Sequence, residues 1–471
     1  MENIEFFKNT KKIYFIGIGG ISQSALALIM KKRGFEVCGS DTQESEITTK
    51  LEENNIKVNH KHSKKNIDNF TPNLIVFSGA IKDENVELMY ARSKNILCLE
   101  RSDFIEKLLP IYNHTVSISG THGKTTTTSM IGEIFLNAKK KTTIHIGGES
   151  VNLNSNYFCG GDDFFITEAC EYRKSFLKFP SEVGVVLNIE EDHPDCYKNL
   201  EEISSSFSQF ASICKNVCVN CEYVNLLNDK KDVISFGIKD KNSNDKKVNY
   251  LAKNVSKISS GGYRFKVYKN DEFFLNVRLN IFGKHNIYNA LASICVADLF
   301  DIDKNIIKKS LSEFKGVKRR FEKFDSKVIP STIYFDYAHH PTEIKNLIDE
   351  TKILNKPIIC VFQPHTYSRT KKYFNDFLLC FKDAYQTVFY KTYSAREKKI
   401  VGGSAKDLYK KLKGKRNVYY YNNLRKIIKH LKKYAKSNCL VLFVGAGDIY
   451  NIKKYLWQKE KISWQGANFI I

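Results

Sequence analysis

The sequence of 471 residues contains only 8 prolines and 25 glycines, which excludes a collagen-like chain and a broadly disordered chain rich in these residues. It also lacks any apolar run near the roughly 18 residues that a membrane-spanning helix requires. The opening segment, MENIEFFKNTKK, includes Glu2 and Glu5 and lacks the apolar stretch of a secretory signal. These absences predict a soluble, globular protein of the cytoplasm.

The 12 cysteines are mostly dispersed singly in apolar segments, as at Cys38 and Cys98. This distribution is typical of free buried thiols in a reducing compartment. One cluster, Cys214-x3-Cys218-x2-Cys221, has the spacing of an iron–sulfur motif. Because the cluster spans the junction of a predicted helix and a predicted strand, its sulfur atoms should point in different directions. We therefore expect free thiols and no metal cluster.

Positive charge is in excess, with 74 Lys and Arg against 51 Asp and Glu, a net charge of +23. Such an excess is compatible with binding to nucleic acid, to a membrane or to an acidic substrate. The lysines are mixed with Asn and Ile, as in residues 239–249, which is typical of solvated loops. We interpret the charge as a general surface property that attracts a polyanionic small substrate, and expect neither nucleic acid nor a membrane as partner.

The length predicts about three domains. Three blocks of sequence each open with an apolar strand followed by a glycine-rich or polar turn. Strands then alternate with helical segments, which predicts an α/β protein with parallel sheets and helices on their faces. Residues 250–280 instead indicate short antiparallel strands, followed by a helix over residues 285–300. The predicted domains cover residues 1–108, 109–318 and 319–471.

The segment GTHGKTTTTS, Gly120 to Ser129, is the strongest functional signal. A glycine-rich loop between a buried strand and a helix directs backbone N–H groups at phosphate, and the helix dipole adds to the attraction. Lys124 is placed to reach the β- and γ-phosphates of ATP, and the Thr125 hydroxyl to ligate Mg²⁺. The standard loop has a glycine at the position of Ile118, so this is the shortened G-T-x-G-K-T form.

Two further strand ends carry polar residues, Glu168 after FFIT and His193 after VVLNIEED. In an open parallel sheet, ligands gather at the carboxyl ends of the strands. A carboxylate and an imidazole placed there are able to hold one or two Mg²⁺ ions against the nucleotide. We therefore predict that both residues lie beside the loop.

The segment GIGGISQS, Gly17 to Ser24, differs from a dinucleotide fingerprint because Ser22 replaces its last glycine. The strand–turn–helix context still favours a nucleotide diphosphate on the helix N-terminus. Ser40 and Asp41, after the second strand, are placed to meet a ribose or a uracil. The adjacent histidines of DYAHHP are unsuited to one metal ion, whereas His365 and Arg369 suit a carboxylate.

Taken together, these segments resemble the Mur ligases over essentially the whole chain. The segments that carry the resemblance are GIGGIS, GTHGKTTTT, EACEYRKSFL, NIEEDH, GKHNIYNALA, GVKRRFE, DYAHHPTEI, FQPHTYSRT and GAGDI. The resemblance implies three domains: an N-terminal Rossmann-like sheet that binds a UDP-sugar, a central P-loop ATPase-like domain that binds ATP, and a C-terminal Rossmann-like domain that closes with the amino acid.

The resemblance also implies roles for individual residues. ATP would be bound by Gly120, Thr121, His122, Gly123, Lys124, Thr125, Thr126, Asn286, Asn289, Arg320 and Asp336. The UDP-sugar would be bound by Gly17, Gly19, Gly20, Ile21, Ser22, Ser40, Asp41 and Ser78. The amino acid would be framed by Tyr337, His339, His365 and Arg369. Thr125 and Glu168 would ligate one Mg²⁺ and His193 a second, with Lys124, Glu168 and His193 as catalytic residues.

The implied activity is ATP-dependent joining of L-alanine to the lactyl carboxylate of UDP-N-acetylmuramate through an acyl phosphate, an early cytoplasmic step of peptidoglycan synthesis. Two alternatives stay open. A recycling ligase would join a tripeptide to the same UDP-sugar, which requires a roomier C-terminal pocket. A P-loop ATPase that binds nucleic acid would use the net charge of +23 and would show strongly salt-dependent binding.

Overall fold

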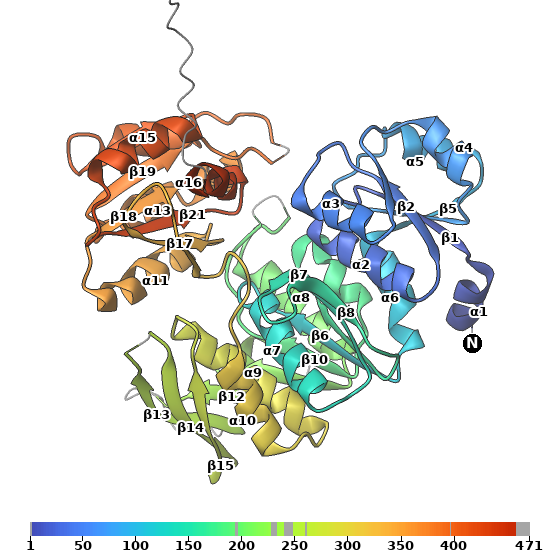
Figure 1. The fold of residues 1–471 in the computed structure, drawn as a ribbon. Coiled ribbons are helices and arrows are strands. Elements are labelled where there is room, and N and C mark those ends of the chain that lie inside the picture. The colour runs from blue at the N-terminus through green and yellow to red at the C-terminus, as the bar shows by residue number, and fades with distance from the viewer. Residues whose placement is uncertain are drawn as a thin grey trace, which may run out of the picture. The chain divides into compact units, whose positions relative to one another are not determined.

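The computed structural model describes residues 2–193, 196–227, 233–239, 248–259, 261–395 and 397–457. The chain forms two compact units, Met1–Lys318 and Arg319–Ile471. The first unit contains two β-sheets and the second contains one (Figure 1). The predicted boundary at residues 108 and 109, within the first unit, stays a prediction. Among the described residues, no helix has both the length and the apolar character needed to cross a membrane.

The N-terminal sheet has five parallel strands in the order β3-β2-β1-β4-β5. Central strand β1 is apolar and fully buried from Ile13 to Ile16, as expected for a parallel strand covered on both faces. The strands are β1 (Lys12–Ile16), β2 (Glu36–Ser40), β3 (Lys57–Asn59), β4 (Leu74–Phe77) and β5 (Leu97–Glu100). The helices are α1 (Glu2–Asn9), α2 (Ile21–Lys32), α3 (Glu46–Glu53), α4 (Lys64–Phe70), α5 (Val86–Ser93), α6 (Arg101–Leu108) and η1 (Leu109–Ile111).

The central sheet has ten strands in the order β15-β14-β13-β12-β11-β10-β6-β9-β7-β8. The strands are β6 (His114–Ser119), β7 (Thr142–Ser150), β8 (Ser155–Cys159), β9 (Phe164–Glu168), β10 (Val183–Val186), β11 (Asn216–Asn220), β12 (Ile234–Ile238), β13 (Tyr250–Lys257), β14 (Tyr263–Lys269) and β15 (Glu272–Leu279). The helices are α7 (Lys124–Asn137), α8 (Leu200–Ile213), α9 (His285–Leu299), α10 (Lys304–Glu313), η2 (Tyr172–Lys178) and η3 (Val224–Leu226). Strands β13, β14 and β15 pair antiparallel, which confirms the prediction for residues 250–280.

The two faces of the central sheet belong to different cores. Helices α7 and α9 pack with Val185 on one face, whereas α8 packs with Val186 on the other. The α8 core continues without a break into β1 and α2 of the N-terminal sheet. Cys218 lies in the first core and Cys214 in the second, so the predicted divergence of these sulfur atoms is confirmed.

The C-terminal sheet has six strands in the order β16-β17-β21-β18-β19-β20, parallel except for β16. The strands are β16 (Glu322–Phe324), β17 (Thr332–Asp336), β18 (Ile358–Phe362), β19 (Gln386–Tyr390), β20 (Val418–Tyr421) and β21 (Leu440–Val444). The helices are α11 (Pro341–Thr351), η4 (Lys352–Leu354), α12 (Tyr367–Lys372), α13 (Phe374–Cys380), α14 (Ala405–Leu412), α15 (Leu424–Tyr434), η5 (Asp448–Ile452) and α16 (Lys453–Trp457). Helices on both faces complete the predicted α/β architecture.

Glu133 is an acidic residue inside α7 and is only 6% exposed. Its carboxylate accepts a hydrogen bond of 3.0 Å from the Ser150 hydroxyl at the end of β7. Burial raises the pKa of Glu133 to about 7, outweighing the opposite effects of Ser150 and Lys315. Because this pKa lies above its ordinary value of 4.5, the contribution of Glu133 to stability is fully present below pH 4.5 and is lost as the pH rises to 7.

We expect Glu133→Gln to be more stable than the wild type at pH 8 by roughly 1–3 kcal/mol, because glutamine keeps an acceptor for Ser150 and does not ionise. At pH 4.5 the two proteins should unfold alike, since the glutamate is then protonated. Thermal unfolding at both pH values measures the difference. If Glu133→Gln differs from the wild type by the same stability at both pH values, ionisation of Glu133 is not the cause of the difference.

Candidate active site

The loop between β6 and α7 contains two glycines in the left-handed region of backbone conformation, Gly120 (φ +143°) and Gly123 (φ +89°). A Cβ atom at Gly123 would lie 2.5 Å from Oδ1 of Asn289, so this position has no room for a side chain. Gly123 is the N-cap of α7. The first N–H groups of α7 have no partner within the helix itself, and such groups bind phosphate.

The phosphate loop is held in place by the segment that follows the neighbouring strand β10. Thr121 N–H donates to the Asn188 carbonyl (3.1 Å), and His122 N–H donates to the Asn188 side chain (2.7 Å). The Asn188 amide donates in return to the His122 carbonyl (3.0 Å). The Thr121 hydroxyl bonds the backbone of Glu190. The loop conformation is therefore fixed by the chain before any ligand arrives.

Lys124 forms a buried ion pair with Glu171, with 2.8 Å between Nζ and Oε2. Its ammonium group also donates to the carbonyls of Gly120 and Thr121. The other carboxylate oxygen of Glu171 lies 3.4 Å from Nε2 of His193. Burial would raise the pKa of Glu171, but Lys124 and His193 outweigh it and hold this pKa at about 2. Glu171 is therefore a buried anion shared by two basic groups.

Glu168 ends β9 and lies directly beside Thr125. The Thr125 hydroxyl donates to Oε2 of Glu168 (3.2 Å), and Gly147 N–H donates to Oε1 (2.6 Å). The hydroxyl and carboxylate oxygens are the hard donors that Mg²⁺ prefers, so this pair fits the ion. His193, with φ of +53°, is connected to Lys124 through their shared partner Glu171. Thr125, Glu168 and His193 were predicted from the sequence to lie at one edge, whereas Glu171 was not predicted to have a role.

Asn286 and Asn289 lie in the first turns of α9 and are buried beside the phosphate loop. Asn289 donates to the side chain of Asn286 (2.8 Å), which donates to the Phe282 carbonyl (2.6 Å). The contact between Asn289 and Gly123 shapes the loop. Their predicted approach to adenosine stays a prediction.

The predicted UDP-sugar residues lie at the carboxyl ends of β1, β2 and β4. Gly17 N–H donates to the Ser40 carbonyl (2.8 Å), and Gly19 N–H to Oδ2 of Asp41 (3.0 Å). Ser78 also lies against Gly17. Gly20 and Ile21 form the N-cap and first residue of α2. The three strand ends therefore form one polar edge, whose nucleotide contacts stay predictions.

Ser40 differs from the other predicted UDP-sugar residues because its side chain is fully buried. Its hydroxyl donates to Glu87 (2.5 Å) and lies 3.0 Å from Nδ1 of His62. Burial would raise the pKa of Glu87, yet the hydrogen bonds from His62 and Ser40 lower it. Ser40 therefore supports the end of β2 from inside the domain. Its neighbour Asp41 is partly exposed and is the more accessible of the two to a ligand.

His145 on β7 is a buried residue that the sequence analysis missed. Its Nε2 lies 2.8 Å from the Ser22 hydroxyl, and its Nδ1 lies 2.8 Å from the Thr167 hydroxyl. Arg101 also donates to the Ser22 hydroxyl (3.0 Å). Burial lowers the pKa of His145 to about 3, so the imidazole is neutral. It therefore links the N-terminal turn of α2 to the residue that precedes Glu168.

The second unit gathers its candidate residues at the carboxyl ends of β17 and β18. Asp336 ends β17 and accepts hydrogen bonds from the N–H groups of Phe321 and Ala338, both of 2.8 Å. Burial raises the pKa of Asp336 to about 6. The Arg320 guanidinium lies 5.2 Å from the centroid of the Tyr337 ring and 3.7 Å from Glu343.

The predicted amino-acid residues of the second unit are neighbours. The rings of His339 and His365 have centroids 5.8 Å apart. Nδ1 of His365 lies 3.2 Å from Nη1 of Arg369, and Arg369 is only 5% exposed. The side chain of Arg369 is therefore held inside the unit next to His365, which a freely solvated surface arginine would not be.

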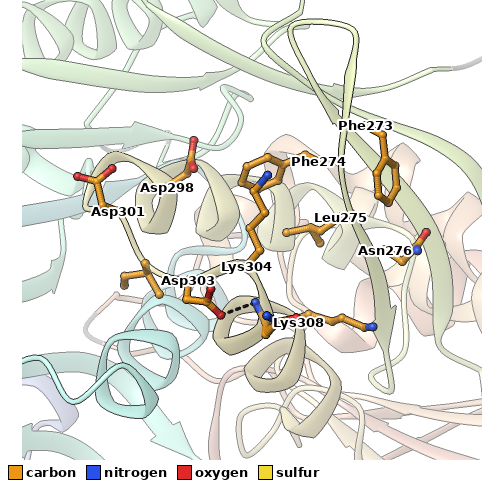
Figure 2. Close-up of a pocket in the computed structure, with 11 residues that line it drawn as sticks. Phe273, Phe274, Leu275, Asn276, Asp298, Asp301, Asp303, Lys304 and Lys308 are labelled. Carbon is orange, nitrogen blue, oxygen red and sulfur yellow. Dashed lines mark hydrogen bonds between the residues drawn. The ribbon is translucent and has the colours of Figure 1, made fainter.

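A surface cavity of about 560 Å³ lies between β15 and the turn from α9 to α10 (Figure 2). Two of the three carboxylates that line it, Asp298 and Asp303, already form hydrogen bonds that support the fold. Asp298 accepts from Tyr250 and from Lys269 (2.6 Å), and Asp303 caps α10 through Asn305 N–H (2.9 Å). None of the residues predicted to bind nucleotide lines this cavity, so it is separate from the candidate active site.

We expect Lys124→Ala to lose up to about 3–5 kcal/mol of stability, since Glu171 is left buried with one partner fewer. Adding Glu171→Gln should recover most of this loss, because the uncompensated charge is removed. Neither variant should bind an ATP analogue with wild-type affinity. Urea unfolding and calorimetric titration measure the two effects.

Lys174→Ala is the matched control, since Lys174 pairs with Glu202 (3.3 Å) on the surface of the same region. Loss of an exposed pair costs about 1 kcal/mol or less. If Lys124→Ala and Lys174→Ala unfold alike, the buried pair does not stabilise the site.

We expect His145→Leu to lower the melting temperature, because the hydroxyls of Ser22 and Thr167 lose a buried partner, each at a cost of about 1–3 kcal/mol. The glutamine side chain reaches the position of Nε2 and is able to bond Ser22, and the asparagine side chain reaches the position of Nδ1 and is able to bond Thr167. The melting temperature should therefore fall less in His145→Gln and in His145→Asn than in His145→Leu. Differential scanning calorimetry of the three variants tests this order. A leucine variant as stable as the other two would refute the bridging role.

Three family models match the chain in order. They are the Mur ligase family catalytic domain over residues 12–112, the Mur ligase middle domain over 118–297, and the Mur ligase glutamate ligase domain over 319–447. The UDP-N-acetylmuramate–L-alanine ligase of Clostridium beijerinckii is 40% identical over 459 residues, covering 95% of this chain and 97% of the relative. The protein of the same name from Clostridium botulinum is 41% identical over 470 residues, covering 97% and 99%.

Solved structures agree with these relatives. The crystal structure of UDP-N-acetylmuramate–alanine ligase from Thermotoga maritima has a TM-score of 0.80 at 28% identity, covering 94% of this chain and 98% of that one. A murein peptide ligase from Psychrobacter arcticus shares the fold, with a TM-score of 0.71 at 22% identity and coverage of 95% and 98%. With a phosphate loop, a neighbouring carboxylate edge and relatives matched over almost their whole length, the chain belongs to the Mur ligase family.

Proposed function

We propose that this protein joins L-alanine to the lactyl carboxylate of UDP-N-acetylmuramate, with conversion of ATP to ADP and phosphate. The observation that carries the proposal is the cluster of Lys124, Thr125, Glu168 and Glu171 at the end of a phosphate loop. The names of relatives about 40% identical over at least 95% of this chain supply the substrates. The product is a precursor for peptidoglycan, and hence for growth of the cell wall.

The chemistry follows from the reacting groups. A carboxylate is a poor acyl donor, so its oxygen first takes the γ-phosphoryl group of ATP and forms an acyl phosphate. The neutral amine of alanine then attacks the carbonyl carbon, and the tetrahedral intermediate expels phosphate as the amide forms. Both steps crowd negative charge between the phosphate and the carboxylate. The residues of the site therefore act mainly by positioning and by neutralising charge.

Each residue of the cluster has a part in this reaction. The N–H groups from Gly120 to Thr126 would hold the phosphates, and the Lys124 ammonium would neutralise the γ-phosphoryl group. Thr125 and Glu168 would hold one Mg²⁺ ion and His193 a second, and Mg²⁺ supplies further positive charge at the transferred group. Glu171 would keep Lys124 charged, because its carboxylate raises the pKa of the lysine against the effect of burial.

The second unit would supply the alanine site. Alanine offers little besides its carboxylate and amine, so recognition depends on those two groups and a small pocket. The Arg369 guanidinium is suited to a carboxylate through two parallel hydrogen bonds. His365, which lies beside Arg369, and His339, which lies beside His365, would frame the amino acid together with Tyr337. The free cysteines support a reducing compartment, and we propose the cytoplasm as the location.

Phosphate release from ATP in the presence of UDP-N-acetylmuramate and Mg²⁺ tests the function, with amino acids supplied one at a time. We expect L-alanine to stimulate release and to appear in the product by mass spectrometry. Turnover with a murein tripeptide and none with alanine would support the recycling ligase instead. Phosphate release that depends on DNA or RNA and ignores the UDP-sugar would refute the ligase.

We expect Glu168→Gln to raise the Mg²⁺ concentration needed for half-maximal activity at least tenfold, because a neutral amide is a weaker ligand than a carboxylate. The KM for UDP-N-acetylmuramate should change little. Titrating Mg²⁺ at saturating substrates measures the effect, and His193→Ala tests the second ion in the same way. An unchanged Mg²⁺ requirement in both variants would remove these residues from the metal site.

We expect Arg369→Lys mainly to raise the KM for L-alanine, because lysine replaces a planar two-point contact with a single point charge. The KM values for ATP and UDP-N-acetylmuramate should stay within about twofold, because Arg369 is not expected to contact either substrate. A lost contact worth 1.4 kcal/mol would change KM about tenfold. Steady-state kinetics with each substrate varied in turn separate the three. If only the KM for ATP rises, Arg369 contacts phosphate and the alanine site lies elsewhere.

A further inference from the structure

The positive charge of the chain is concentrated in its second unit. Residues 319–471 contain 31 Lys and Arg against 12 Asp and Glu, a net charge of +19. Residues 1–318 contain 43 against 39, a net charge of only +4. A general preference for lysine throughout the chain would raise the net charge of both units. The interpretation of the charge as a uniform surface property is therefore incomplete, and the second unit requires a local explanation.

Within the second unit, most of the excess falls on one stretch. Residues 398–436 carry fourteen Lys or Arg and a single acid, Asp407, which belongs to the capping box of α14. All fourteen basic side chains are exposed. The stretch contains α14, edge strand β20 and α15, and the two helices bury their apolar residues in cores on opposite faces of the sheet. Positive charge therefore lies on both sides of edge strand β20.

The topology places much of this charge at the amino ends of the strands. Helix α14 connects the parallel strands β19 and β20, and α15 connects β20 to β21. Each helix must therefore run from the carboxyl edge of the sheet back to the amino edge. The last turns of both helices, with residues 413–416, bring basic residues to the amino edge. His339, His365 and Arg369 lie at the carboxyl edge, so a partner at the amino edge leaves them uncovered.

Two apolar side chains are exposed at the same edge, one in the last turn of α13 and one just before β19. Leu379 is 63% exposed and Tyr385 is 60% exposed. Both adjoin the basic residues: Arg416 donates to the Leu378 carbonyl (3.5 Å), and Asn417 donates to the Tyr385 carbonyl (3.5 Å). Asp383, which lies between them in sequence, is paired with Lys352 (2.6 Å). An exposed aliphatic and an exposed aromatic side chain next to a basic stretch form an arrangement suited to the interface of an anionic lipid bilayer.

We propose that this basic edge, formed by residues 379–385, residues 413–417 and the last turns of α14 and α15, docks the protein on a membrane that contains anionic phospholipid. Binding is peripheral: the headgroups neutralise the basic side chains while Leu379 and Tyr385 enter the interface. The proposal replaces the expectation that a membrane is not a partner, and it is independent of the ligase reaction.

The same surface is less suited to nucleic acid. Stacking on bases requires exposed aromatic faces, but the rings near β20 stack on one another. The centroid of His430 lies 4.4 Å from that of Tyr419 and 4.6 Å from that of Tyr434, and none of the three is exposed. Leu379 would gain nothing from a phosphate backbone. Charge together with an exposed aliphatic residue favours lipid.

Cosedimentation of the full chain with vesicles tests the proposal. We expect binding to vesicles of phosphatidylglycerol and phosphatidylcholine, at least tenfold weaker binding to phosphatidylcholine alone, and release at about 0.5 M salt, where charges are screened within a few ångströms. The triple variant Lys413→Glu/Lys415→Glu/Arg416→Glu should bind at least tenfold more weakly than the wild type. Leu379→Ser/Tyr385→Ser should bind several-fold more weakly at the same net charge.

The matched control is Lys304→Glu/Lys308→Glu/Lys309→Glu on α10, which removes the same charge from exposed positions of the first unit and should bind as the wild type does. Circular dichroism melting confirms that each variant is folded. Equal loss of binding in both triple variants would show attraction by net charge alone and overturn the docking surface. Displacement of the vesicles by a short DNA or RNA duplex at lower concentration would assign the surface to nucleic acid and overturn the proposal as well.

Discussion

The buried ion pair between Lys124 and Glu171 is the interaction on which the candidate active site depends. It joins the first residue of α7 to the segment after β9, two parts of the chain 47 residues apart. The same lysine bonds two carbonyls of the phosphate loop, and the same glutamate reaches His193. A buried pair adds little net stability over apolar packing, but loss of either partner is costly. The pair therefore fixes where the loop, the carboxylates and the imidazole lie.

Parallel sheets explain why polar residues far apart in sequence become neighbours. All three sheets place the carboxyl ends of parallel strands at one edge, and the backbone there ends in loops instead of ladder hydrogen bonds. In the first unit this brings Gly17, Asp41 and Ser78 together in one sheet and Thr125 and Glu168 in the other. The buried imidazole of His145 spans the two groups. In the first unit, buried and hydrogen-bonded residues such as Ser40 and His145 support these edges from below.

The sequence predicted the parts of the site that have a local signature. A glycine-rich loop before a helix, and polar residues directly after buried strands, indicate a phosphate site whatever the rest of the chain does. The supporting roles of Ser40, Glu171 and His145 have no such signature, because they depend on contacts with Glu87, Lys124 and Ser22, which are 47, 47 and 123 residues away. The second carboxylate of E-A-C-E was a visible signal for Glu171. A count of charge by domain would likewise have revealed the basic second unit.

Sharing of Glu171 between two basic groups has a consequence for the proposed reaction. In this structure the Lys124 ammonium bonds the loop carbonyls and Glu171, so it must exchange some of these bonds to reach a γ-phosphoryl group. An isolated buried carboxylate would oppose that movement, because leaving it unpaired is costly. His193 also lies beside Glu171, with 3.4 Å between Nε2 and Oε1, so the carboxylate keeps a second partner when the lysine turns. The carboxylate therefore lets Lys124 move while it keeps the surrounding residues in place.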